Sequence, residues 1–119
     1  MRLTALVVAA GLLWPISAFS ETTTYDAVVF VLDKDLFAFC SDRSPNSQSL
    51  CNGYLAGVAD AVGVFNAMRA DKIACLQTNT TNGQVKDIVM QYLTAHPEKR
   101  DLDAAGEVLI VLQAAFPCH

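Results

Sequence analysis

Four cysteines and two histidines are the residues of this 119-residue chain whose chemistry is easiest to recognise. They are Cys40, Cys51, Cys75, Cys118, His96 and His119. A cysteine nucleophile needs a free thiolate beside a base, whereas an even number of cysteines in a small exported protein is typical of disulfides. No two cysteines have the spacing Cys-x2-Cys and the histidines are 23 positions apart, which disfavours zinc. We therefore expect two disulfides, no cofactor and no metal.

Paired carboxylates are the other candidates for catalysis. Asp33 and Asp35, like Asp101 and Asp103, stand two positions apart, so on a helix they diverge and cannot form an acid/base dyad. We interpret them as solvated or helix-capping residues. Because no other group suggests a reaction, we expect the chain not to be an enzyme.

Asp60 shares one side of a predicted helix with Gly53 and Gly57, whose missing side chains let another backbone approach. A buried carboxylate without partners would be costly, so Asp60 is expected to accept hydrogen bonds from a neighbouring segment or a tyrosine. We take Asp60 and Tyr54 as structural polar residues. The alternative is that Asp60 contacts a ligand.

The overall charge narrows the range of partners. A net charge of −4 and a hydrophobic fraction of 53% indicate one small acidic globular domain rather than a disordered chain. Nucleic acids and anionic membranes both require a basic surface, so neither is an expected partner.

The first twenty residues have the pattern of a secretory signal peptide. Arg2 precedes an apolar run from Leu3 to Leu13, and Ala18 and Ser20 supply small residues at a cleavage site before Glu21. We expect residues 1–20 to be removed, leaving a single periplasmic domain, residues 21–119. A retained anchor is the alternative, but Pro15 would break a spanning helix. The mature chain would keep 12 acidic and 7 basic residues, a net charge of −5.

Apolar spacing predicts four helices and no strands. The first is expected from Thr24 to Cys40, capped by Thr23 or Thr24, with Phe30 and Phe37 forming a second apolar stripe. A turn is expected from Ser41 to Ser49. The second helix places its core face from Leu50 to Met68 and ends around residues 69–72, and that face comprises Leu50, Tyr54, Leu55, Val58, Ala61, Val62, Phe65 and Met68.

The two remaining helices have clear boundaries. Thr81 and Gln84 have the spacing of a capping box that begins the third, and Pro97 ends it. Asp101 or Asp103 caps the fourth, which Pro117 stops. The predicted fold is therefore an all-α, up-and-down bundle of four main helices.

This helix order constrains the cysteine pairing. Cys40 ends the first helix beside Cys51 near the start of the second, and Cys75 and Cys118 each follow a helix at the other end. A bond between Cys51 and Cys75 is nearly excluded, because a helix over the 24 intervening positions would hold them roughly 36 Å apart. Of the three possible pairings we expect Cys40 with Cys51 and Cys75 with Cys118.

Several motifs, in order, resemble the Rap/Tai family of type VI secretion immunity proteins. They span residues 39–118 and comprise Cys51-Asn-Gly-Tyr-Leu-Ala-Gly-Val-Ala-Asp60, Cys75-Leu76, Gln84 to Val89, Tyr92-Leu93-Thr-Ala-His96-Pro97-Glu98 and Ala104-Ala105 leading to Ala115-Phe116-Pro117-Cys118. One departure is Gln77, where the family often has proline. The resemblance implies a periplasmic, disulfide-bonded protein, typically a homodimer, that inhibits a peptidoglycan amidase effector.

Two turns are polar enough to protrude from the domain and bind such an amidase. Glu98, Lys99 and Arg100 are three consecutive charges that we interpret as having no core role, and they are the first candidate. The second candidate is the turn with Gln77, Thr78 and Asn79. The alternative for the first turn is a solvated connection between helices. The alternative for the whole chain is a small periplasmic acid-stress chaperone or lipid carrier.

Overall fold

The computed structural model describes residues 28–119, which form four α-helices and one short 3₁₀ helix. They are α1 (Asp33–Ser41), α2 (Pro45–Met68), α3 (Asn82–Ala95), η1 (Pro97–Lys99) and α4 (Ala104–Ala115). This described part has one isolated β-bridge, between Leu32 and Asp103, and no strand. The all-α prediction is confirmed. The expected signal peptide lies outside the described residues.

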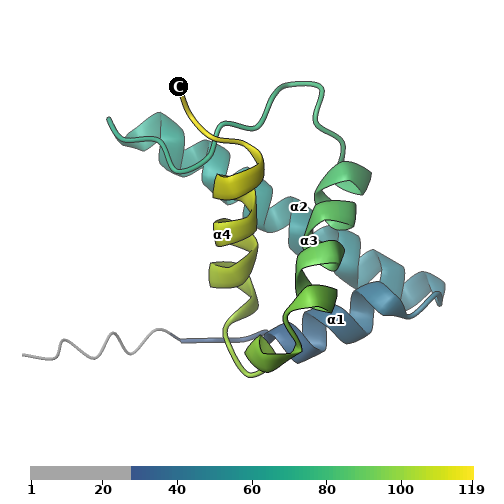
Figure 1. Cartoon of the computed structure of the whole chain (residues 1–119). Helices are drawn as coiled ribbons and strands as arrows, with labels where there is room; N and C mark the ends of the chain where they lie inside the picture. Colours follow the sequence, from purple (N-terminus) through teal and green to yellow (C-terminus); the bar gives the residue numbers. More distant parts are fainter. Residues whose placement is uncertain (1–27) are drawn as a thin grey trace, which may run out of the picture.

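The helices form two antiparallel pairs, α1 with α2 and α3 with α4, which pack across one another (Figure 1). Every pair of α-helices is in contact. Each helix buries one apolar face against its neighbours, and together these faces form the core. The buried core side chains are leucine, valine, alanine and cysteine, so the core is almost entirely aliphatic. Its largest fully buried apolar side chains are Leu36, Leu55, Leu93, Leu112, Val62, Val89 and Val108.

Both predicted disulfides are confirmed. Cys40 is bonded to Cys51 and Cys75 to Cys118, with Cα–Cα distances of 5.0 Å in each case. The first closes the α1–α2 connection, and the second ties the segment after α2 to the segment after α4. No described cysteine is free.

The prediction that the first helix runs through residues 28–32 is wrong, because α1 begins at Asp33. The preceding segment pairs with the start of α4 instead: the Ala104 amide donates to the Val31 carbonyl at 3.0 Å. Such tertiary backbone bonds replace the local ones that a longer helix would need. Residues 24–27 of that expected helix lie outside the described residues.

The expected turn from Ser41 to Ser49 is shorter than predicted. α2 already begins at Pro45, where a missing amide costs nothing because the first helical amides have no partner within the helix. Ser44 caps it by accepting a hydrogen bond from the Ser47 amide at 3.3 Å. The connection between α1 and α2 is therefore only residues 42–44.

The capping predictions for the last two helices are confirmed. Thr81 accepts from the Gln84 amide while the Gln84 side chain accepts from the Thr81 amide. Of the two candidates for α4, Asp103 is the cap, and it accepts from the Gly106 amide at 2.6 Å. In the described part, no helix combines the length and apolarity that crossing a membrane requires.

Candidate partner-binding surfaces

The turn after α3 does not present three free charges, so the interpretation that Lys99 and Arg100 have no core role is wrong. Lys99 Nζ donates to the carboxylate of Glu107 at 3.0 Å and also to the hydroxyl of Tyr92. Tyr92 in turn donates to Glu107 at 2.5 Å. Lys99 is partly exposed, but its ammonium group neutralises a buried carboxylate.

Burial alone would oppose ionisation of Glu107, but the hydrogen bonds from Tyr92 and Lys99 outweigh it and hold the pKa of Glu107 below its usual value. The same cluster raises the pKa of Lys99, through the hydrogen bonds to Tyr92 and then Glu107. Both residues are thus charged at neutral pH, and the turn is fixed to α3 and α4.

Arg100 fixes the same turn to α1. Its guanidinium lies over the ring of Phe37, 3.9 Å from the centroid, and donates to the Leu93 carbonyl at 2.6 Å. Its own carbonyl accepts from the Lys34 amide. Only Glu98 of the three predicted residues is an exposed charge, and it pairs with His96 at 2.9 Å.

The turn with Gln77, Thr78 and Asn79 matches its prediction better. All three side chains are exposed, and the turn closes through a bond from the Thr80 amide to the Gln77 carbonyl at 2.9 Å. Hollows lie on both sides of it: Gln77 and Thr80 line one with Asp60 and another with Phe116. Figure 1 shows this connection projecting beyond the ends of α3 and α4.

Both ends of this connection are anchored. Before it, Asn66 of α2 donates to the Ala74 carbonyl at 2.6 Å and accepts from the Ile73 amide at 2.8 Å, and Cys75 carries a disulfide. After it, the capping box of Thr81 begins α3. The turn is therefore held in place without the use of its own side chains.

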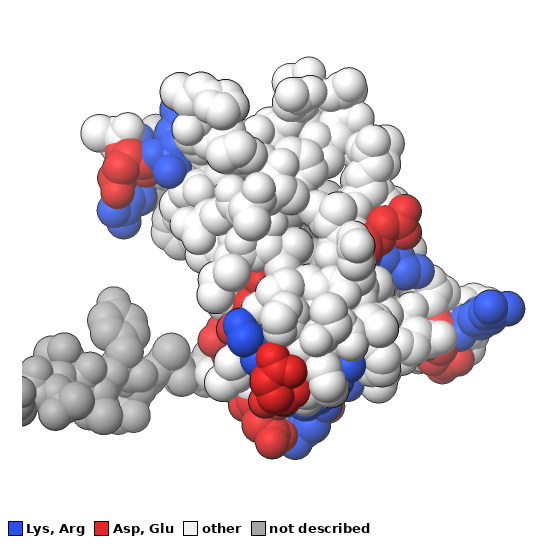
Figure 2. Space-filling model, viewed as in Figure 1, with Lys and Arg blue, Asp and Glu red and all other residues white. Residues whose placement is uncertain are grey.

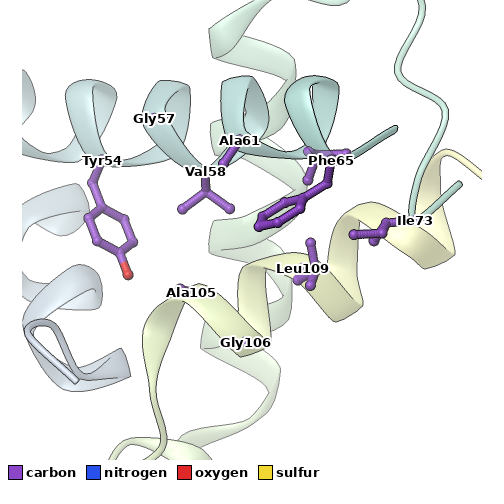
Figure 3. Close-up of a pocket in the computed structure, with 10 residues that line it drawn as sticks. Tyr54, Gly57, Val58, Ala61, Phe65, Ile73, Ala105, Gly106 and Leu109 are labelled. Atoms are coloured by element: carbon purple, nitrogen blue, oxygen red, sulfur yellow. The ribbon is translucent and has the colours of Figure 1, made fainter. Parts of the chain in front are cut away.

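An apolar groove of about 460 Å³ runs between α2 and α4. Figure 3 shows the side chains of Tyr54, Val58 and Phe65 reaching from α2 toward α4, where Leu109 lies opposite. All of its lining residues are uncharged: Tyr54, Gly57, Val58, Ala61, Val62, Phe65, Ile73, Ala105, Gly106 and Leu109. On the face in Figure 2 the charged side chains gather mostly at the edges.

The predicted core face of α2 is wrong at both ends of the helix, where three of its residues are exposed. Phe65 is 51% exposed and Met68 is 77% exposed, because α2 extends past the helices that could cover its last turns. Leu50 is also exposed, near the other end of the helix. Val62 and Leu55 are buried as predicted.

Phe30 and Phe37 do not form the predicted stripe. Phe30 lies before α1 and is 91% exposed, whereas Phe37 packs against the core and Arg100. Phe30 lines a second hollow together with Tyr54 and Ala105, both of which also line the apolar groove. The two hollows are therefore neighbours that share Tyr54 and Ala105, and Phe30 lines only the second hollow.

Asp60 is exposed on α2, so it is not the buried hydrogen-bond acceptor that was expected. Tyr54 is half-buried at the end of the apolar groove, where burial and the nearby carboxylates of Asp103 and Asp33 raise its pKa. Asp60 and Tyr54 therefore lie on different surfaces of the domain.

In residues 28–119 no group of three or more His, Cys, Asp or Glu side chains could hold a metal ion. The projecting turn and the apolar groove are surfaces suited to binding another macromolecule. The projecting turn offers amide and hydroxyl groups, and the groove offers apolar area.

Comparison with known proteins identifies the family. The family model described as Rap1a immunity proteins matches residues 33–118, which include all four helices and both disulfides. No curated protein and no solved structure matches the chain. On the strength of the family match over most of its length, the chain belongs to the Rap1a immunity protein family.

Proposed function

We propose that this protein is exported to the periplasm and protects the producing cell by binding and inhibiting a peptidoglycan amidase effector of type VI secretion. Membership of an immunity family is the observation that carries this proposal, because an immunity protein acts by binding a toxin. The amidase and the periplasm rest on the resemblance of the motifs and on the pattern of residues 1–20. In this account the protein itself performs no catalysis.

We assign the amidase contact to the turn with Gln77, Thr78 and Asn79. An inhibitor that enters an active-site groove loses less entropy when its inserting loop is already ordered. This turn satisfies that condition, since the disulfide of Cys75 and the clamp of Asn66 hold it from one side and the capping box from the other. Its exposed side chains stay free to pair with a partner.

The turn after α3 is less suited to the same role. Lys99 and Arg100 are already bonded within the domain, so a partner would have to break those contacts to use them. The two turns also lie at opposite ends of α3, roughly 20 Å apart at 1.5 Å per residue. One inserted loop cannot include both, so Glu98 would belong to a separate, peripheral contact.

A homodimer is part of the proposal, and the apolar groove is where we place it. Two copies of an acidic chain repel each other, so they associate most easily through a face without charges. The groove is such a face, because all of its lining residues are uncharged. The exposed ring of Phe30 lines the neighbouring hollow, and in a dimer it would fill the groove of the second copy. A two-fold interface must be self-complementary, and a projecting ring beside a hollow on one face can meet that condition.

Co-purification tests the proposal. The mature protein, tagged at its C-terminus, is mixed with each exported amidase of the producing organism and analysed by size-exclusion chromatography with light scattering. A stoichiometric complex with one of them supports the proposal. If the protein forms a complex with none of these amidases at micromolar concentration, the proposal is wrong.

A further inference from the structure

Asp33, the first residue of α1, is a carboxylic acid in an unusual environment. Its exposure is 0%, and neither of its carboxylate oxygens has a hydrogen-bond partner among the described residues. A buried ionised carboxylate without partners is strongly unfavourable, so this position favours the neutral acid. Neither the immunity role nor the dimer explains why an acid stands here.

The groups that face Asp33 come from three sides. Glu107 approaches from α4 and Tyr54 from α2, while the segment before α4 supplies Asp103, Arg100 and Lys99. The two cations are already engaged, Lys99 with Glu107 and Arg100 with the Leu93 carbonyl. Asp103 accepts from the Gly106 amide. Asp33 is therefore the one carboxylate of this cluster without a partner of its own.

The backbone around Asp33 fastens a strap, residues 99–103, to the start of α1. The Asp33 amide donates to the Leu102 carbonyl and the Lys34 amide donates to the Arg100 carbonyl, each at 3.0 Å. The Ala104 amide donates to the Val31 carbonyl at the same distance. Charge on the Asp33 side chain would arise on a residue whose own amide makes one of these bonds, and near the carboxylates of Glu107 and Asp103.

We propose that Asp33 is a proton-controlled latch, which holds the strap on α1 while its carboxyl group is neutral and loosens it when that group is charged. The strap carries the exposed carboxylate of Asp101, and Glu98 directly precedes it. The latch therefore controls how rigidly the carboxylates of Asp101 and Glu98 are held at the protein surface. It acts independently of any partner.

The direction of the pH effect follows from proton linkage. Burial, reinforced by the charge of Glu107, raises the pKa of Asp33 from 3.8 to about 6. The folded protein thus binds this proton more tightly than the unfolded chain does, so the latch strengthens as pH falls from about 7.5 to 5. Glu107 has a lowered pKa and stays ionised throughout that interval.

Amide hydrogen exchange of the mature protein at pH 5 and pH 7.5, corrected for intrinsic exchange rates, tests the latch. The amides of Asp33, Lys34 and Ala104 should lose up to about tenfold protection at pH 7.5, while that of Val89 in the core should change much less. Asp33→Asn, neutral at both pH values, should remove the difference. Asp87→Asn, an exposed carboxylate on α3, is the matched control and should retain it.

Equal pH dependence in wild type and Asp33→Asn overturns the proposal, as does a loss at Val89 as large as that at Lys34. A second measurement needs no variant and so does not depend on its folding. The carboxyl-carbon chemical shift of Asp33, followed by NMR in the wild-type protein, should titrate near pH 6. A midpoint below about 4 shows an ordinary ionised aspartate and overturns the latch.

Discussion

The guanidinium of Arg100 covers the ring of Phe37, with 3.9 Å between its central carbon and the ring centroid. This contact joins the turn after α3 to α1, two segments more than sixty positions apart in the sequence. A charge that looks solvated in the sequence is thus part of the packing. It also removes Phe37 from the surface on which a dimer was expected.

Replacing Arg100 with alanine should destabilise the domain by about 1–2 kcal/mol. The variant loses the cation–π contact and leaves the Leu93 carbonyl without its donor. Urea unfolding followed by circular dichroism measures the change. Glu98→Ala, which removes a neighbouring but exposed charge, is the control and should leave the midpoint unchanged. Equal midpoints for the two variants would show that the Arg100 contacts do not stabilise the fold.

The disulfide between Cys75 and Cys118 should stabilise the fold more than the one between Cys40 and Cys51. It closes a sequence separation of 43 rather than 11, so the loop-entropy model gives about 4 against about 3 kcal/mol. Replacing each pair with alanines and comparing melting temperatures tests this difference. A larger loss on removing the shorter loop would mean that native-state contacts, not chain entropy, dominate.

Asn66 should be essential for the shape of the connection that leads to the projecting turn. Its side chain both donates to Ala74 and accepts from Ile73, so Asn66→Ala leaves two backbone groups unpaired and should cost about 1–3 kcal/mol. Asn66→Asp keeps the acceptor but loses the donor, and should fall between wild type and alanine. Identical stability of the alanine variant and wild type would rule out the clamp.

The proposed dimer should depend on Phe65. Phe65→Glu places a charge in the apolar groove, and light scattering at micromolar concentration should then report a monomer where the wild type gives twice that mass. Leu50→Glu is the matched control: Leu50 lies on the same helix with similar exposure but outside the groove, and its variant should stay dimeric. A monomeric wild type would end the dimer proposal.

Local signals in the sequence were sufficient for the parts of the fold that local chemistry determines. The capping box of Thr81 and Gln84, an aspartate cap for α4 at one of two positions and the cysteine pairing were all predicted, since each follows from short spacings or from helix order. The start of α1 was not, because the chain before Asp33 pairs with the start of α4, through the bond between the Val31 carbonyl and the Ala104 amide and the bridge between Leu32 and Asp103. Apolar spacing cannot reveal such a long-range pairing.

The same distinction applies to the candidate site. The exposed turn with Gln77 and Asn79 could be recognised from its polar composition. The internal role of Lys99 could not, because Glu107 stands eight positions away in another helix and looks like any surface glutamate. The apolar groove was also missed, since Phe65 has the spacing of a core residue and only the length of α2 leaves it exposed.

Inhibition of peptidoglycan hydrolysis by the cognate exported amidase is the measurement that tests the central claim most directly. The mature protein should abolish hydrolysis at equimolar concentration. A variant with alanine at Gln77, Thr78 and Asn79 should bind at least tenfold more weakly, about 1.4 kcal/mol, with an unchanged melting temperature. Full inhibition by that variant would contradict the assignment of the turn. Undiminished hydrolysis by every exported amidase of the producing cell, at a large excess of the wild-type protein, would contradict the function itself.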